Sequence, residues 1–178
     1  MKANQTAQNL IFKSPLVLAV AVITFFCSAM TPVNFAVNFT GEWKLNEQKS
    51  ELGQFGRMAA KSLKVNGQSD SISYERTSTS QAGEPVITKE SLTFDGKESE
   101  STISGGNAKK KSSAKWSDDG QSLVINSTIL LNRDGETMEI KVKETWKLTD
   151  NGNSLLIESN STSSFGENSM KLVYDKVK

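Results

Sequence analysis

The stretch "AKKKSSAKWSDDGQSLVINSTILL", residues 108–131, is the clearest indication of fold class in this 178-residue chain. On both sides of the turn-forming "SDDG", apolar or small residues alternate with polar ones, with Trp116 before the turn and Leu123 and Ile125 after it. A period of two is typical of a β-strand with one buried face, and a short turn rich in Asp and Gly joins antiparallel neighbours. The segment therefore predicts a β-hairpin.

The same alternation continues in both directions along the chain. Turn-formers interrupt it every ten to fifteen residues or so, among them "NGQSD", "QAGE", "DGK", "SGGN", "NRDG", "TDNGN" and "SFGE". We expect strands near residues 39–45, 61–66, 70–79, 85–94, 97–104, 108–117, 121–131, 136–148, 154–162 and 168–177.

Strands joined by short connections are antiparallel neighbours, and a meander removes its open edges by closing on itself. The sequence therefore predicts an all-β fold: an antiparallel up-and-down meander closed into a single barrel of about 8–10 strands. Residues 46–60 are too short and too glycine-rich for two helices, so we expect at most one short helix after the first strand.

The residues between the apolar positions are largely Ser, Thr and Lys, which suits an outer wall in water rather than in lipid. Basic and acidic residues are balanced, with 21 Lys and Arg against 20 Asp and Glu. This balance gives no reason to expect nucleic acid or an anionic membrane as a partner.

Residues 1–29 have the pattern of a secretory signal, with Lys2 and Lys13, an apolar run over 16–26 and the small-residue exit "CSA". We expect a signal peptide at 1–29, a linker at 30–38 and the barrel at 39–178. The mature chain would be exported to the periplasm or the exterior, with no integral membrane span. Cys27 as a lipid-modified first residue is the alternative, although Phe26 precedes it where a small residue is preferred. An uncleaved N-terminal anchor is a third.

The segment "FTGEWKL", residues 39–45, resembles the G-x-W signature on the first strand of calycins, the superfamily of lipocalins and fatty-acid-binding proteins. The resemblance implies that Gly41 lets the backbone come close and that Trp43 closes one end of the barrel. It also implies a basic side chain from near the chain end over the Trp ring, either Lys176 or Lys178. The chain more specifically resembles uncharacterised secreted bacterial proteins described as lipocalin-like, which share "G-x-W-K-L-N" and a terminal "L-V-Y-D-K".

Fatty-acid-binding proteins hold the ligand carboxylate with an Arg two positions before a Tyr on the last strand. Tyr174 matches this Tyr, but Leu172 stands where the Arg would be. The resemblance therefore does not carry that carboxylate site over to this chain.

Following the apolar member of each alternation places four ionisable residues inside the barrel: Arg76, Glu90, Lys110 and Glu144. Unpaired charges there would cost several kcal/mol each, so we expect at least one ion pair among them. The candidate ligand-binding set comprises these four together with Tyr74, Ser127 and Tyr174. The alternative is a strand phase shifted by a bulge, or a position at a solvated barrel mouth.

The chain contains no His, and its only Cys is Cys27. Imidazole and thiolate catalysis and the usual zinc ligands are therefore excluded from the mature chain, and no motif predicts a metal or cofactor. Glu90 and Glu144 are the nearest approach to a catalytic carboxylate pair. We expect that the protein is not an enzyme.

Two function classes remain from the sequence. The first is a secreted or periplasmic, monomeric, lipocalin-like binding protein that holds a small apolar or amphiphilic ligand in its barrel. The second is a protein-interaction or inhibitor-type barrel whose interior is filled by its own side chains. Small inward residues such as Thr88, Ser112 and Ser127 favour the first class, because they leave room in the interior.

Overall fold

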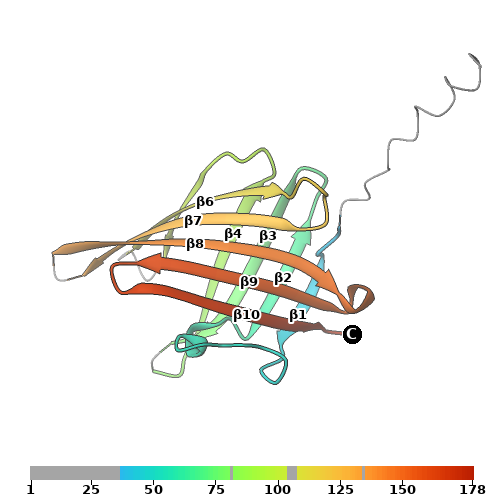
Figure 1. The fold of residues 1–178 in the computed structure, drawn as a ribbon, viewed down its shortest axis with the longest axis horizontal. Helices are drawn as coiled ribbons and strands as arrows, with labels where there is room; N and C mark the ends of the chain where they lie inside the picture. Colours follow the sequence, from blue (N-terminus) through green and yellow to red (C-terminus); the bar gives the residue numbers. More distant parts are fainter. Residues whose placement is uncertain (1–36, 81, 104–107, 134) are drawn as a thin grey trace, which may run out of the picture. The chain divides into compact units, whose positions relative to one another are not determined.

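The computed structural model describes residues 37–80, 82–103, 108–133 and 135–178 (Figure 1). The predicted signal peptide, 1–29, and nearly all of the predicted linker lie outside the described residues.

The described residues form ten strands, close to the predicted positions. In chain order they are β1 (Gly41–Leu45), β2 (Ser62–Gly67), β3 (Ser71–Thr79), β4 (Pro85–Thr93), β5 (Ser99–Ile103), β6 (Ala108–Trp116), β7 (Leu123–Arg133), β8 (Glu136–Thr149), β9 (Ser154–Ser163) and β10 (Gly166–Lys176).

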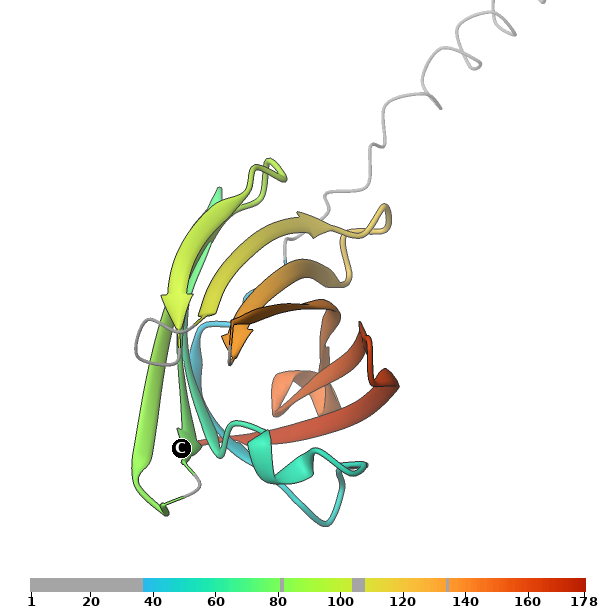
Figure 2. The same cartoon turned by 90° about the vertical axis from the view of Figure 1, so that its left-hand side faces the viewer.

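The strands form one antiparallel sheet in the order β4-β3-β2-β1-β10-β9-β8-β7-β6-β5. The first and last strands pair, with Trp43 opposite Lys176, and the sheet curls round on itself (Figures 1 and 2). The predicted all-β meander of eight to ten strands is confirmed, with ten strands in a nearly closed barrel.

Closure is incomplete at one seam. Strands β4 and β5 are the two edges of the sheet, and the described residues show no hydrogen-bonded ladder between them. Strand β4 nevertheless lies beside both β5 and β6. Side chains rather than backbone hydrogen bonds must therefore hold this part of the wall together.

Helix is confined to short turns in the part of the chain that the structure describes. A 3-10 turn, η2 (Gly56–Met58), lies in the region where one short helix was predicted, and a second, η4 (Asp150–Gly152), joins β8 to β9. Among the described residues, no helix has the length and apolarity that a membrane crossing requires.

One end of the barrel is plugged by aromatic side chains. Trp43 is fully buried and its indole Nε1 donates a hydrogen bond to the Phe39 carbonyl, 3.0 Å away. Phe39 stacks on Trp116 and meets Trp146 edge to face, with ring centroids 5.8 and 6.0 Å apart. The predicted burial of Trp43 is confirmed, and we call this end the closed end.

The predicted cation over Trp43 is also present. Lys176 Nζ lies 5.3 Å from the ring centroid, within the range of a cation–π contact. Gly41 has φ +150, and a Cβ there would lie 3.1 Å from Lys176 Cε. Glycine therefore lets the first strand pass close beneath the lysine, as the resemblance implied.

The inner faces of the strands differ sharply between the two ends. Toward the closed end, Leu123, Trp146, Leu155 and Ile157 are 0% exposed. Toward the other end, which we call the open half, most of the large inward-facing side chains remain accessible to solvent. Val86 is 41% exposed, and the half-buried members are Thr88, Ile129, Leu131, Met138, Ile140, Val142 and Met170.

Candidate functional site

A layer of charged side chains separates the packed half from the open half. Arg76 on β3 and Glu144 on β8 form a bidentate ion pair across the barrel. Arg76 Nη1 donates to Glu144 Oε1 at 2.9 Å, and Nη2 donates to Oε2. The planar guanidinium matches the two carboxylate oxygens, which fixes the pair in direction as well as distance. The two side chains are 21% and 12% exposed.

Two aromatic rings hold this pair in place. The Arg76 guanidinium lies 5.1 Å from the Tyr74 ring centroid and 5.5 Å from that of Trp146. Trp146 Nε1 also donates a hydrogen bond to Glu144 Oε2, at 3.0 Å. Trp146 was not among the candidate site residues; its position two residues after Glu144, on the same strand face, is the sequence signal that could have indicated this contact.

The second ion pair bridges the seam of the barrel. Lys110 on β6 lies 2.6 Å from Glu90 Oε2 on β4, and the Tyr74 hydroxyl donates to the same oxygen. These side chains are also mostly buried, at 17% exposed for Lys110 and 9% for Glu90. A side-chain contact thus links two strands that no backbone ladder joins.

The protonation states follow from the balance between burial and neighbouring charge. Burial alone would raise the pKa of Glu144, but the charge and hydrogen bonds of Arg76 outweigh it and hold that pKa below its usual value. Burial likewise opposes ionisation of Glu90, yet Lys110 lowers its pKa. Burial raises the pKa of Tyr74 well above its usual value. Near neutral pH the charged layer therefore carries two cations, two anions and no net charge.

The layer also contains hydrogen-bonding groups outside the ion pairs. Arg76 Nε is buried and has no hydrogen-bond partner within the described part of the chain. The Ser112 and Ser127 hydroxyls, on neighbouring strands, lie 2.9 Å apart and hydrogen-bond each other. The layer is thus well ordered, but the Arg76 Nε–H donor has no acceptor among the described residues.

Six of the seven predicted site residues gather in or beside this layer: Arg76, Glu90, Lys110, Glu144, Tyr74 and Ser127. The predicted inward phase and the predicted ion pairing are confirmed. Tyr174 also faces the interior, where it is 1% exposed, but its hydroxyl donates to the Ala60 carbonyl at 3.1 Å rather than to a member of the layer. That tyrosine anchors the β1–β2 connection, and ligand binding by the set stays a prediction.

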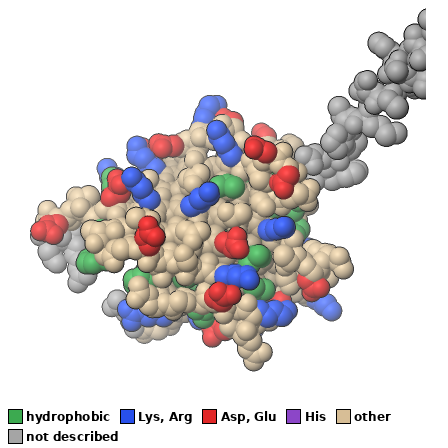
Figure 3. All heavy atoms as spheres, in the orientation of Figure 1, with side chains coloured by type: hydrophobic (Ala, Val, Ile, Leu, Met, Phe, Trp, Pro, Cys, Tyr) green, Lys and Arg blue, Asp and Glu red, His purple; other side chains and the backbone are tan. Residues whose placement is uncertain are grey.

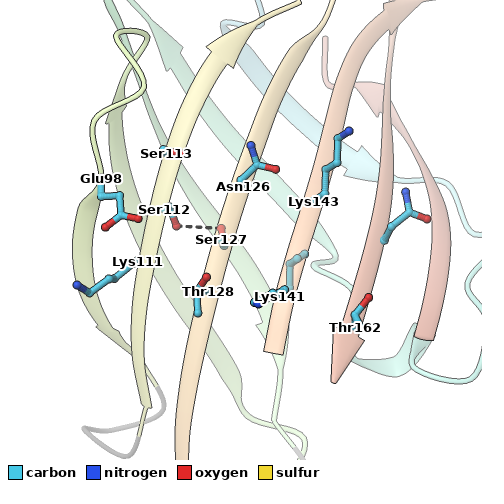
Figure 4. A pocket seen from close by; sticks show the side chains of 12 residues that line it. Glu98, Lys111, Ser112, Ser113, Asn126, Ser127, Thr128, Lys141, Lys143 and Thr162 are labelled. Atoms are coloured by element: carbon cyan, nitrogen blue, oxygen red, sulfur yellow. Dashed lines mark hydrogen bonds between the residues drawn. The ribbon is translucent and has the colours of Figure 1, made fainter. Parts of the chain in front are cut away.

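The outer wall of the described barrel carries hollows that were not anticipated from the sequence. The first, of about 320 Å³, lies over β6 to β9, where outward-facing Lys111, Thr128 and Lys141 line it (Figure 4). The second, of about 490 Å³, lies over β2 to β4 and includes Lys64 and Lys89. On the face that Figure 3 shows, basic and acidic side chains are interspersed rather than gathered by sign. The described residues hold no group of three or more metal-binding side chains.

No protein-family model matches the chain, and no curated protein is significantly similar to it. Among solved structures, the chain is similar to the crystal structure of zebrafish ileal bile acid-binding protein complexed with cholic acid. The match covers 78% of this chain and 98% of that chain, with 16% sequence identity and a TM-score of 0.46. Most of the aligned residues therefore differ between the two proteins.

Proposed function

We propose that this chain binds a small amphiphilic molecule inside the barrel. The apolar part of the molecule would lie against the open half, and its polar end would meet the charged layer. The proposed role is binding without a reaction, because the two carboxylates of the charged layer, Glu90 and Glu144, are each engaged in an ion pair within the described residues.

The contrast in burial between the two halves supports this proposal most directly. Inward-facing Leu123, Leu155 and Ile157 are inaccessible to solvent, whereas Ile129, Ile140 and Val142 on the same kind of inner face are not. Leaving apolar area in water costs about 25 cal/mol per Å², so an occupant that covers it gains that free energy. Apolar walls with a few placed polar groups are typical of small-molecule sites.

Native mass spectrometry of the protein purified from its source tests the proposal. We expect a bound small molecule that is released on denaturation. Ile140→Trp, which adds bulk to the inner face of the open half, should reduce the bound fraction. Lys141→Trp adds an indole at the next, outward-facing position and serves as the matched control. An unliganded protein, or equal occupancy in both variants, would refute binding inside the barrel.

Three exposed apolar side chains favour the second candidate, a protein-interaction barrel. Phe55 and Met58 in the β1–β2 connection are 40% and 68% exposed, and Phe165 in the β9–β10 turn is 84% exposed. Large apolar side chains in loops are common anchors of protein interfaces. The protein-interaction function is supported if native mass spectrometry finds no small molecule and if Phe165→Ser abolishes binding of an identified, purified partner protein.

We further propose that the chain is exported to the periplasm or the exterior and acts as a monomer. The signal-like pattern of residues 1–29 supports export. The mass of the mature N-terminus distinguishes cleavage after Ala29 from lipid modification of Cys27. Sedimentation of the mature protein measures its oligomeric state.

A further inference from the structure

We infer that the polar end of the bound amphiphile is uncharged and carries a hydroxyl, as in a long-chain alcohol or a monoacylglycerol, and that the charged layer selects against free fatty acids. This inference rests on the proposed binding function.

Both cations of the layer are already neutralised. Two guanidinium nitrogens of Arg76 donate hydrogen bonds to the Glu144 carboxylate, and Lys110 Nζ lies 2.6 Å from Glu90 Oε2. A ligand carboxylate could pair with either cation only by displacing its glutamate. That glutamate would then be left as an unpaired charge in a mostly buried place, which is strongly unfavourable.

A ligand carboxylate that left the pairs intact would face a second obstacle. It would lie close to Glu90 and Glu144, both ionised near neutral pH, and would add a third negative charge to a layer that holds two positive ones. A neutral ligand keeps the balance of charge unchanged. The arrangement therefore penalises an anion whether or not it breaks an ion pair.

A ligand hydroxyl, by contrast, matches the hydrogen-bond donors and acceptors of the layer that the ion pairs leave unused. The Lys110 ammonium has three N–H donors, and one of them is engaged in a hydrogen bond with Glu90 among the described residues. Carboxylate oxygens accept more than one hydrogen bond. A hydroxyl can accept from Lys110 and donate to a carboxylate oxygen at the same time, whereas an ionised carboxylate can only accept.

The test compares ligands that share one chain length and differ at the polar end: dodecanoic acid, dodecanol and monododecanoin. Each is titrated against the purified mature protein by displacement of a fluorescent apolar dye, at a mildly alkaline pH where the acid is ionised. We expect the alcohol and the monoacylglycerol to bind at least about tenfold more tightly than the acid, because only the acid disturbs the charge balance.

Two outcomes overturn the inference and can be told apart. Equal or tighter binding of the acid refutes the selection against anions while the carrier function stands. Absence of binding by all three compounds refutes the carrier function for this chain length and the inference with it.

Charge-removing variants provide a second arm. Glu144→Gln keeps the shape of the side chain and leaves Arg76 without its counter-charge, so the ratio of acid to alcohol affinity should rise by about tenfold or more. Glu90→Gln, which frees Lys110, should act in the same direction if the first variant does not fold. Glu139→Gln removes a charge from an outward-facing position on β8, where the partner is the exposed Lys141, and should leave the ratio unchanged. An unchanged ratio in both inward-facing variants would overturn the inference.

Discussion

Lys110 on β6 and Glu90 on β4 form an ion pair, 2.6 Å from nitrogen to oxygen, across the seam where the described sheet has no ladder between its two edges. The pair is mostly buried, and Tyr74 adds a hydrogen bond to the same carboxylate oxygen. It therefore links the edge strand β4 to β6, the neighbour of the other edge strand, and contributes half of the charged layer.

Replacing Lys110 by Met should lower the free energy of unfolding by about 3 kcal/mol, because the mostly buried Glu90 loses its counter-charge. Denaturant unfolding monitored by circular dichroism measures the change. Lys111→Met is the control: Lys111 is the next residue, faces outward and pairs with the exposed Glu100, so its loss should cost less than about 1 kcal/mol. Equal effects of the two substitutions would show that the seam pair does not stabilise the barrel.

Replacing Trp43 by Ala should cost about 3–5 kcal/mol of stability, the range for large buried aromatic side chains. The substitution removes the fully buried ring, its hydrogen bond to Phe39 and the surface on which Lys176 rests. The shift of the unfolding midpoint in denaturant checks this. An unchanged midpoint would refute the role of Trp43 in closing the barrel.

Stability should fall in acid partly through Glu144. Its pKa in the folded protein is below the usual value of 4.5 because the charge and hydrogen bonds of Arg76 outweigh the cost of burial. Because the pKa of Glu144 is lower in the folded than in the unfolded protein, its ionised carboxylate contributes fully to stability above the unfolded-state pKa. That contribution is lost as the pH falls through the folded-state pKa. The stability difference between wild type and Glu144→Gln should therefore be constant near neutral pH and shrink below about pH 4.5. A difference independent of pH down to acid unfolding would contradict this.

Neither tyrosine should ionise at its usual pKa in the folded protein. The chain has two tyrosines, and burial raises the pKa of Tyr74 and of Tyr174 above the usual value of 10.0. Because the pKa of each tyrosine is higher in the folded than in the unfolded protein, folding favours the neutral phenol. The contribution of the buried tyrosines to stability is therefore present below pH 10 and is lost as the pH rises further. Spectrophotometric titration should show almost no tyrosinate at pH 10.0 in the folded protein and about half ionisation in denaturant. Half ionisation of either tyrosine at that pH in the folded state would show that it is not buried as described.

Features that depend on local pattern could be predicted from the sequence alone. Alternation with a period of two placed the strands and their inward faces, because a strand buries every second side chain wherever it lies in the fold. The alternation therefore predicted that four ionisable residues lie in the interior: Arg76, Glu90, Lys110 and Glu144. The Gly41–Trp43 motif predicted the closed end of the barrel. The cost of burying lone charges then predicted that these residues would pair.

Which cation pairs with which carboxylate depends on how the sheet curls, and the local pattern does not contain that information. Arg76 and Glu144 are 68 residues apart, on strands that are not neighbours in the sheet, and curling of the sheet brings them face to face. The same closure places β4 beside β6, so that Glu90 meets Lys110, and it leaves one half of the interior packed and the other accessible. Strand register, sheet order and curvature set such contacts between distant residues, and a two-residue period contains none of that information. Tyr174 shows the same limit: the family resemblance made it a candidate ligand-binding residue, but in the structure its hydroxyl donates a hydrogen bond to the Ala60 carbonyl in the β1–β2 connection.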